Sequence, residues 1–172
     1  YNIQLSHKYF IVLSIHIQNK DEDLWKEDFL TNVHEYKIAR FIITNVMEEL
    51  INQEMHGYMT EVDDMLFCLI NTDYGADCKK KLLNVIDEAS RFIEDKYKLT
   101  LLFAAGALHE SIEWIHDAFA ESVNAMEYAR VMGIQRAVFY DDIQADGNYY
   151  HYPVEKEYQL INCIKSMNNQ GA

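Results

Sequence analysis

The stretch from Gly57 to Asn71, GYMTEVDDMLFCLIN, decides how the rest of the chain is interpreted. Gly57 to Glu61 and Met65 to Asn71 both have the composition of strands, and the short connector Val62-Asp63-Asp64 separates them. The sequence therefore predicts a β-hairpin here. The nearly continuous apolar run from Met65 to Ile70 predicts a central strand that is covered on both faces.

On both sides of the hairpin, segments with apolar residues at every second position alternate with segments in which they recur about every 3.6 positions. The predicted order is β-α-β-β-α-β-α-β-α, and its first six elements form a split βαβ unit. We expect an α/β (α+β) sandwich of ferredoxin-like type, with a mainly antiparallel sheet of about five strands flanked by helices. The other predicted elements are strands at 9–18, 99–108 and 137–140, and helices at 24–51, 73–96, 112–132 and 155–167.

The composition is that of a single globular domain with a strong negative charge. The 172 residues carry a formal net charge of −13, which opposes non-specific binding to nucleic acid. The three cysteines have no CxxC spacing, and no apolar run is long enough to span a bilayer. We therefore expect a reducing, cytoplasmic setting. Because the sequence starts without an initiator Met, we also expect it to be a domain of a longer protein.

The late part of the chain resembles the GGDEF, or nucleotidyl-cyclase-like, domain. Leu101 to Ala107 (LLFAAGA) is similar to the family strand that ends in Ser-x-Gly, and Val138-Phe139-Tyr140 is similar to the closing strand. Between them, Ser122 to Gly133 (SVNAMEYARVMG) resembles the family helix AD-x-A-L-Y-x-A-K-x-x-G. The similarity covers roughly residues 9 to 142 and implies the cyclase-like sandwich. The matching positions in the helix are Ala125, Met126, Ala129, Arg130 and Gly133.

The resemblance implies a nucleotide and metal site at the end of the first strand and in the hairpin. The family's first-strand acids align with His16 and Gln18, and its GGDEF motif aligns with residues 62–66, where Asp64 alone keeps its type. Because Val62 and Asp63 carry Cβ atoms where glycines allow close approach, we expect Asp63 and Asp64 to turn a hairpin. We therefore predict that the chain is not an enzyme and that it binds neither a cofactor nor a metal ion.

The tail resembles a segment of AraC-type transcription regulators. Residues 150–161 (YHYPVEKEYQLI) are similar to the "YP-x-x-x-E-x-x-L" stretch that precedes their helix-turn-helix module. The resemblance implies a GGDEF-like domain at 1–148 and a connecting segment at 149–172. The predicted function is a non-catalytic module that relays an upstream signal to a C-terminal DNA-binding domain.

The expected partners are the other domains of the same regulator and a second copy forming a homodimer, with DNA bound only through the helix-turn-helix part. The parent is either a soluble regulator or one anchored in a membrane. Tyrosine is common at interfaces, so the cluster near the tail is either a packed connection or an interdomain surface. That cluster is Tyr149, Tyr150, Tyr152 and Pro153.

Two other functions stay open at this point. The first is a nucleotide- or small-ligand-binding regulatory domain that uses a vestigial pocket. The second is a nucleotide cyclase that still turns over. The vestigial pocket would contain His16, Gln18, Asp63 and Asp64.

Overall fold

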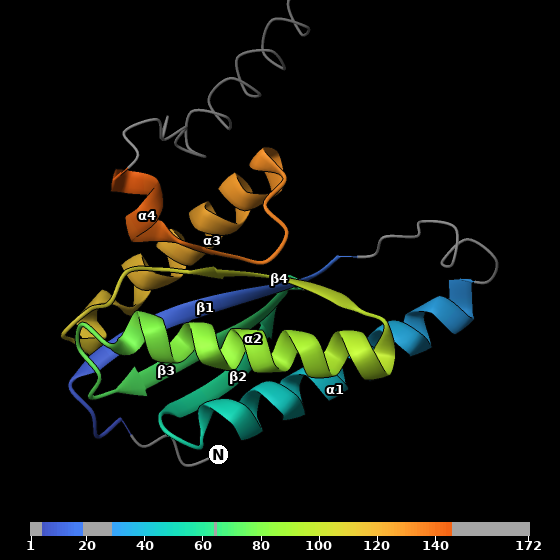
Figure 1. Ribbon diagram of the computed structural model, residues 1–172, viewed down its shortest axis with the longest axis horizontal. Coiled ribbons are helices and arrows are strands. Elements are labelled where there is room, and N and C mark those ends of the chain that lie inside the picture. The colour runs from blue at the N-terminus through green and yellow to red at the C-terminus, as the bar shows by residue number, and fades with distance from the viewer. Residues whose placement is uncertain (1–4, 19–28, 64, 146–172) are drawn as a thin grey trace, which may run out of the picture.

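The computed structural model describes residues 5–18, 29–63 and 65–145 of the chain. Five strands form one sheet in the order β2-β3-β1-β4-β5, with every neighbouring pair antiparallel except β4 and β5 (Figure 1). The strands are β1 (Tyr9–Gln18), β2 (His56–Val62), β3 (Met65–Thr72), β4 (Thr100–Ala105) and β5 (Ala137–Phe139). The predicted α+β sandwich with a five-stranded sheet is confirmed.

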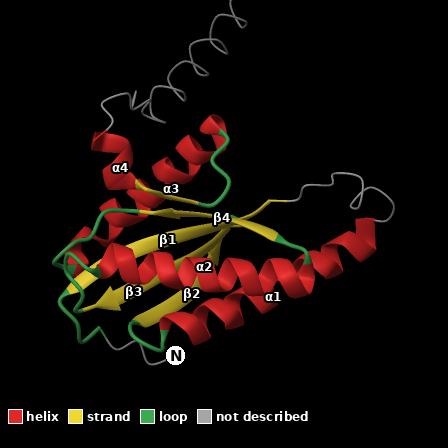
Figure 2. Ribbon diagram, viewed as in Figure 1, coloured by secondary structure: helices red, strands yellow, loops and turns green. Residues whose placement is uncertain are grey.

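Helices cover both faces of this sheet (Figure 2). The pair α1 and α2 packs on one face, while α3 packs on the other face over β1, β4 and β5. The helices are α1 (Phe29–Ile51), α2 (Cys78–Tyr97), α3 (Ile115–Met132) and α4 (Tyr140–Ala145), and the 3₁₀ turn η1 (Ile112–Trp114) precedes α3.

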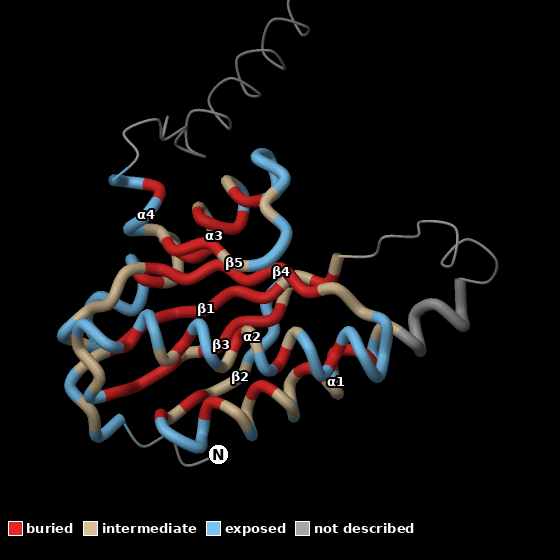
Figure 3. Tube along the Cα trace, viewed as in Figure 1, coloured by how far each residue is buried: buried red, intermediate tan, exposed pale blue. Residues whose placement is uncertain are grey.

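The core follows the alternation of β1, whose successive side chains point to opposite faces. Leu13 and Ile15 are buried with the inner stripes of α1 and α2, and Val12 packs with Phe67 and Ala118 on the opposite face. Figure 3 shows the buried part of the trace concentrated in the central strands. None of the described helices is long and apolar enough to cross a membrane.

Small residues at the end of β4 and directly after it bring α3 close to the sheet. A Cβ added to Gly106 would lie 2.4 Å from the carbonyl oxygen of Ala118 on α3. The buried Ser14 hydroxyl lies 3.0 Å from the carbonyl oxygen of Ala104 and 3.1 Å from that of Ser122. Larger side chains here would push the helix away from the sheet.

Several predicted bounds are wrong. The second helix begins at Cys78 rather than at residue 73, because Asp73 is engaged with the segment that leads into β1. Tyr140 starts the short helix α4 instead of ending β5. On β3, Met65 and Leu69 are only half-buried, so the strand is not fully covered on both faces. The predicted last helix at 155–167 and the start of the first helix at 24–28 lie outside the described residues.

Candidate functional site

The end of β1 and the tip of the β2–β3 hairpin lie at the same end of the sheet. Ile15 near the end of β1 pairs with Leu66 on β3, immediately after the hairpin turn. His16 and Gln18 therefore lie beside the turn that contains Asp63, as the resemblance implied. Their partners on the other side are Leu102 and Thr100 of β4.

His16 points toward α3 and is half-buried. Burial lowers the pKa of His16 below its usual value, and the positive charge of Arg130 on α3 lowers it further. The neutral imidazole is thus favoured at this position. A neutral imidazole can accept or donate a hydrogen bond, but it supplies no negative charge to a metal-bound triphosphate.

Asp63 turns the hairpin in a left-handed conformation, with a φ of +47°. Val62 pairs with Met65, so the connector is shorter than predicted and contains only Asp63 and Asp64. Asp residues tolerate positive φ better than most others do. The turning role predicted for Asp63 agrees with this geometry, whereas Asp64 lies outside the described residues.

An ion pair between α1 and the hairpin was not predicted. The guanidinium of Arg40 bonds to the Glu61 carboxylate on β2, and it lies 4.5 Å from the centre of the Tyr36 ring. Arg40 is buried although it carries a charge. The sequence does contain a sign of this burial. Tyr36, Arg40 and Ile43 are spaced by about one helical turn, so Arg40 lies on the face of α1 that points to the core.

The described side chains at this end do not fit a pair of divalent metal ions. Hard cations require several oxygen ligands, mostly carboxylates, whereas the end of β1 offers an imidazole and an amide. Within residues 5–18, 29–63 and 65–145, no group of three or more His, Cys, Asp and Glu side chains could hold a metal ion.

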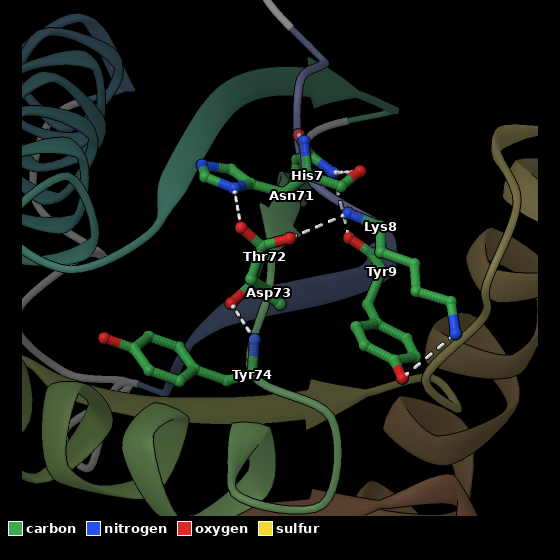
Figure 4. A network of polar contacts seen from close by, with 7 residues as sticks. All are labelled: His7, Lys8, Tyr9, Asn71, Thr72, Asp73 and Tyr74. Atoms are coloured by element: carbon green, nitrogen blue, oxygen red, sulfur yellow. Dashed lines mark hydrogen bonds and ion pairs between the residues drawn. The ribbon is translucent and has the colours of Figure 1, made fainter.

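A second polar cluster lies at the opposite end of the sheet, where the chain enters β1 (Figure 4). The Asp73 carboxylate lies 2.6 Å from Nδ1 of His7 and accepts a hydrogen bond of 3.1 Å from the backbone N–H of Lys8. These contacts lower the pKa of Asp73, with the Lys8 N–H as the largest cause and His7 next. The buried Asn71 side chain also bonds to this entering segment. Sequence reasoning missed the cluster because its members are 62 to 66 positions apart.

A buried cysteine and the tyrosine cluster near the tail lie apart from these two sites. Cys68 is fully buried in β3, and burial raises the pKa of its thiol to about 12, so the nucleophilic thiolate is disfavoured there. The tyrosine cluster with Pro153, at 149–153, lies outside the described residues. The interdomain surface predicted there stays a prediction, as does the boundary at residue 148.

Comparison with known proteins gives one informative result. No protein family and no curated protein matches the chain. Among solved structures, the active GGEEF domain of a diguanylate cyclase from Vibrio cholerae matches with a TM-score of 0.55 and 14% sequence identity. The match covers 77% of this chain and 83% of that one.

This match contradicts the prediction that the chain is not an enzyme, because the domain that shares its fold is described as active. The prediction that the chain is not an enzyme was based on the residue types at the site. The shared fold points the other way. What the comparison shows for this chain is its architecture, which is the cyclase-like α+β sandwich.

Proposed function

We propose that this domain is a signal-relay module of a bacterial AraC-type transcription regulator. It would lie in the cytoplasm between an upstream sensor and a C-terminal helix-turn-helix domain, in a soluble or a membrane-anchored parent. The chain has 28 acidic and 15 basic residues, and this excess of negative charge opposes contact with DNA phosphates. In the proposal, the helix-turn-helix domain therefore makes the contacts with DNA. The partners would be the neighbouring domains and a second copy in a homodimer.

The observation that carries the proposal is that the described chain enters and leaves at one end of the sheet. β1 is antiparallel to β4, and β4 is parallel to β5, so β1 starts where β4 and β5 end. The segment 5–8 leads in at this end, and α4 follows β5 there (Figure 1). A displacement of the entering segment would therefore occur at the same end of the sheet as α4, the helix that leaves it.

Specific contacts hold each of the two segments to the body of the domain, the entering segment to the loop after β4 and α4 to α2. Lys8 on the entering segment pairs with Glu110 at 3.2 Å, and Phe10 exchanges two backbone hydrogen bonds of 2.8 Å with His109. On the departing side, Lys79 in the first turn of α2 pairs with Asp142 of α4. These contacts support the proposed relay only in that each ties one connecting segment to the same end of the domain.

The test uses the intact regulator and a reporter for its target promoter. Replacing residues 149–153 with Gly and Ser of equal length keeps the tether but removes the tyrosines and Pro153. We expect DNA binding to persist and the response to the upstream signal to be lost. The matched control is Leu83→Ala, an exposed substitution on α2. An unchanged signal response in the linker variant would contradict the proposal.

A nucleotide cyclase is the second candidate, favoured by the fold shared with an active diguanylate cyclase domain. The chain would be incubated with GTP or ATP and magnesium, and the products separated by chromatography and identified by mass spectrometry. A cyclic product that exceeds the buffer control and is lost in Asp63→Ala would establish this activity. No product under these conditions would remove the candidate.

A further inference from the structure

A cavity of about 550 Å³ opens between the sheet, α3 and the end of α1. Its floor consists of Val12 on β1 with Phe67 and Leu69 on β3, and α3 contributes Ile115 and Phe119 as one wall. The cavity exists because α3 packs on β1, β4 and β5, while the same face of β2 and β3 carries half-buried side chains. None of His16, Gln18 and Asp63 lines it.

The size and the walls of this cavity are those of a small-molecule site. Pockets for organic ligands usually have volumes of about 300 to 1,000 Å³ and mostly apolar and aromatic walls. The rings of Phe67 and Phe119 have centroids 4.7 Å apart and are inclined by 40°. Tyr58 on β2 is a third aromatic residue of the lining. A flat apolar ring system would match these walls.

The charge at the rim selects the type of polar group on the ligand. Glu48 near the end of α1 lines the cavity and is half-buried, and the described residues that line it include no Lys or Arg. The neighbouring Asn52 side chain already accepts a hydrogen bond of 3.0 Å from the Gly57 N–H. The Glu48 carboxylate is therefore the charged group that a ligand would meet, beside the hydroxyls of Tyr58 and Thr60, and an anionic ligand would be repelled.

We propose that this cavity binds a small organic cation, consisting of a flat apolar ring system with one amine that pairs with Glu48. The rings occupy the space over Phe67 and Leu69, beside Phe119. The amine forms a charge-assisted hydrogen bond with the carboxylate, which is stronger than a neutral one. The site is separate from the end of β1 and does not require the relay function.

The test uses 1-naphthylmethylamine as the probe and 1-naphthylacetate as its anionic counterpart, with binding to the full chain measured by isothermal titration calorimetry. We expect saturable binding of the amine and at least tenfold weaker binding of the carboxylate. Absence of saturable binding of the amine at millimolar concentration would overturn the proposal, and so would equal binding of the two probes.

Two pairs of variants assign the binding to this cavity. Glu48→Gln removes the charge and should weaken amine binding roughly tenfold, while Glu49→Gln, an exposed neighbour on the same helix, should leave it unchanged. Leu69→Trp fills the floor and should abolish binding, while the exposed Leu83→Trp should not. Circular dichroism and thermal unfolding verify that each variant is folded.

The apolar walls could instead be covered by a second copy of the chain, and sedimentation equilibrium separates this case. A dimer that Leu69→Trp dissociates and that 1-naphthylmethylamine does not affect would overturn the small-molecule site. Equal loss of amine binding in Glu48→Gln and Glu49→Gln would also overturn it, because the charge of the cavity would then play no part.

Discussion

The side-chain amide of Asn71 holds the backbone of His7 through both of its polar atoms. Its nitrogen donates to the His7 carbonyl oxygen at 2.9 Å, and its oxygen accepts from the His7 N–H at 2.9 Å. The same nitrogen lies 2.9 Å from the Tyr9 carbonyl oxygen, and the residue is fully buried at the end of β3. The side chain thereby continues the β1–β3 hydrogen bonding past the register pair Tyr9 and Thr72.

Asn71→Ala should destabilise the domain by about 2–3 kcal/mol, because the substitution removes the three hydrogen bonds that the buried amide makes to the partly buried backbone of His7 and Tyr9. The loss is measured by urea unfolding. Hydrogen exchange should also show faster exchange of the His7 amide. Asn45→Ala is the control, since the exposed Asn45 bonds to the Phe41 carbonyl oxygen of its own helix. Equal losses in the two variants would contradict the clamping role.

Asp73 should make the domain sensitive to acid. Its pKa is lowered in the fold by the Lys8 N–H and by His7, so its contribution to stability is present above the unfolded value of 3.8 and is lost as the pH falls through the lower folded value. Asp73→Asn should flatten the stability curve in this window relative to wild type. The exposed Asp95→Asn should keep the wild-type slope. The curves come from thermal unfolding between pH 2.5 and pH 6.

His16 should act on stability in a higher pH window. Since burial and Arg130 lower its pKa from 6.5, the unfolded chain binds the proton more tightly, and the folded state loses stability as the pH falls below about 6.5. The stability of His16→Gln relative to wild type should therefore increase as the pH is lowered from 7.5 to 5. His116→Gln, at an exposed position on α3, serves as the control. A constant difference between His16→Gln and wild type over this range would contradict the lowered pKa.

Gly106 should not tolerate a side chain. The added Cβ of Gly106→Ala would meet the Ala118 backbone at 2.4 Å, and forcing α3 outward should cost about 1–3 kcal/mol. Gly75→Ala is matched to it, because a Cβ there would have its nearest contact at 3.4 Å, with the Tyr9 hydroxyl. Chemical unfolding of both variants compares the free energies. A loss in Gly106→Ala no larger than that in Gly75→Ala would contradict the close packing of α3 at Gly106.

The hairpin turn should prefer glycine over a β-branched residue at position 63. Asp63→Gly relieves the cost of its positive φ and should be neutral or stabilising by up to about 1 kcal/mol, whereas Asp63→Val should destabilise by about 1–2 kcal/mol. Thermal unfolding measures both. Indifference of the melting temperature to both changes would indicate that the turn adopts another conformation.

Most of the fold could be predicted because its signals are local. The strand pattern of Tyr9 to Gln18 gives the exact bounds of β1, and Gly133, a residue type common at this position, ends α3 in a left-handed conformation. The start of α2 could not be predicted, because Asp73 and Asn71 bond to a segment more than 60 positions earlier. A helical pattern in the sequence cannot reveal such competition for a side chain.

The candidate site was predictable in its position but not in its surroundings. The resemblance put His16, Gln18 and the hairpin at one end of the sheet, and the β1–β3 register brings them there. The Arg40–Glu61 pair and the Arg130 charge near His16 were not foreseen, since each joins side chains of different elements, which no single helical or strand pattern brings together. The prediction about catalysis used residue types alone and is contradicted by the fold neighbour.

The sequence by itself determined the strands, the helices and the hairpin, because the alternation of apolar side chains and the turn residues act within a few positions. Only the tertiary structure decided where α3 stops on the sheet, which leaves the cavity beside Glu48 and Phe119. It also decided that the entering segment and α4 share one end. Both depend on strand pairing and on close packing at Gly106, which are properties of surfaces in contact and not of any one segment.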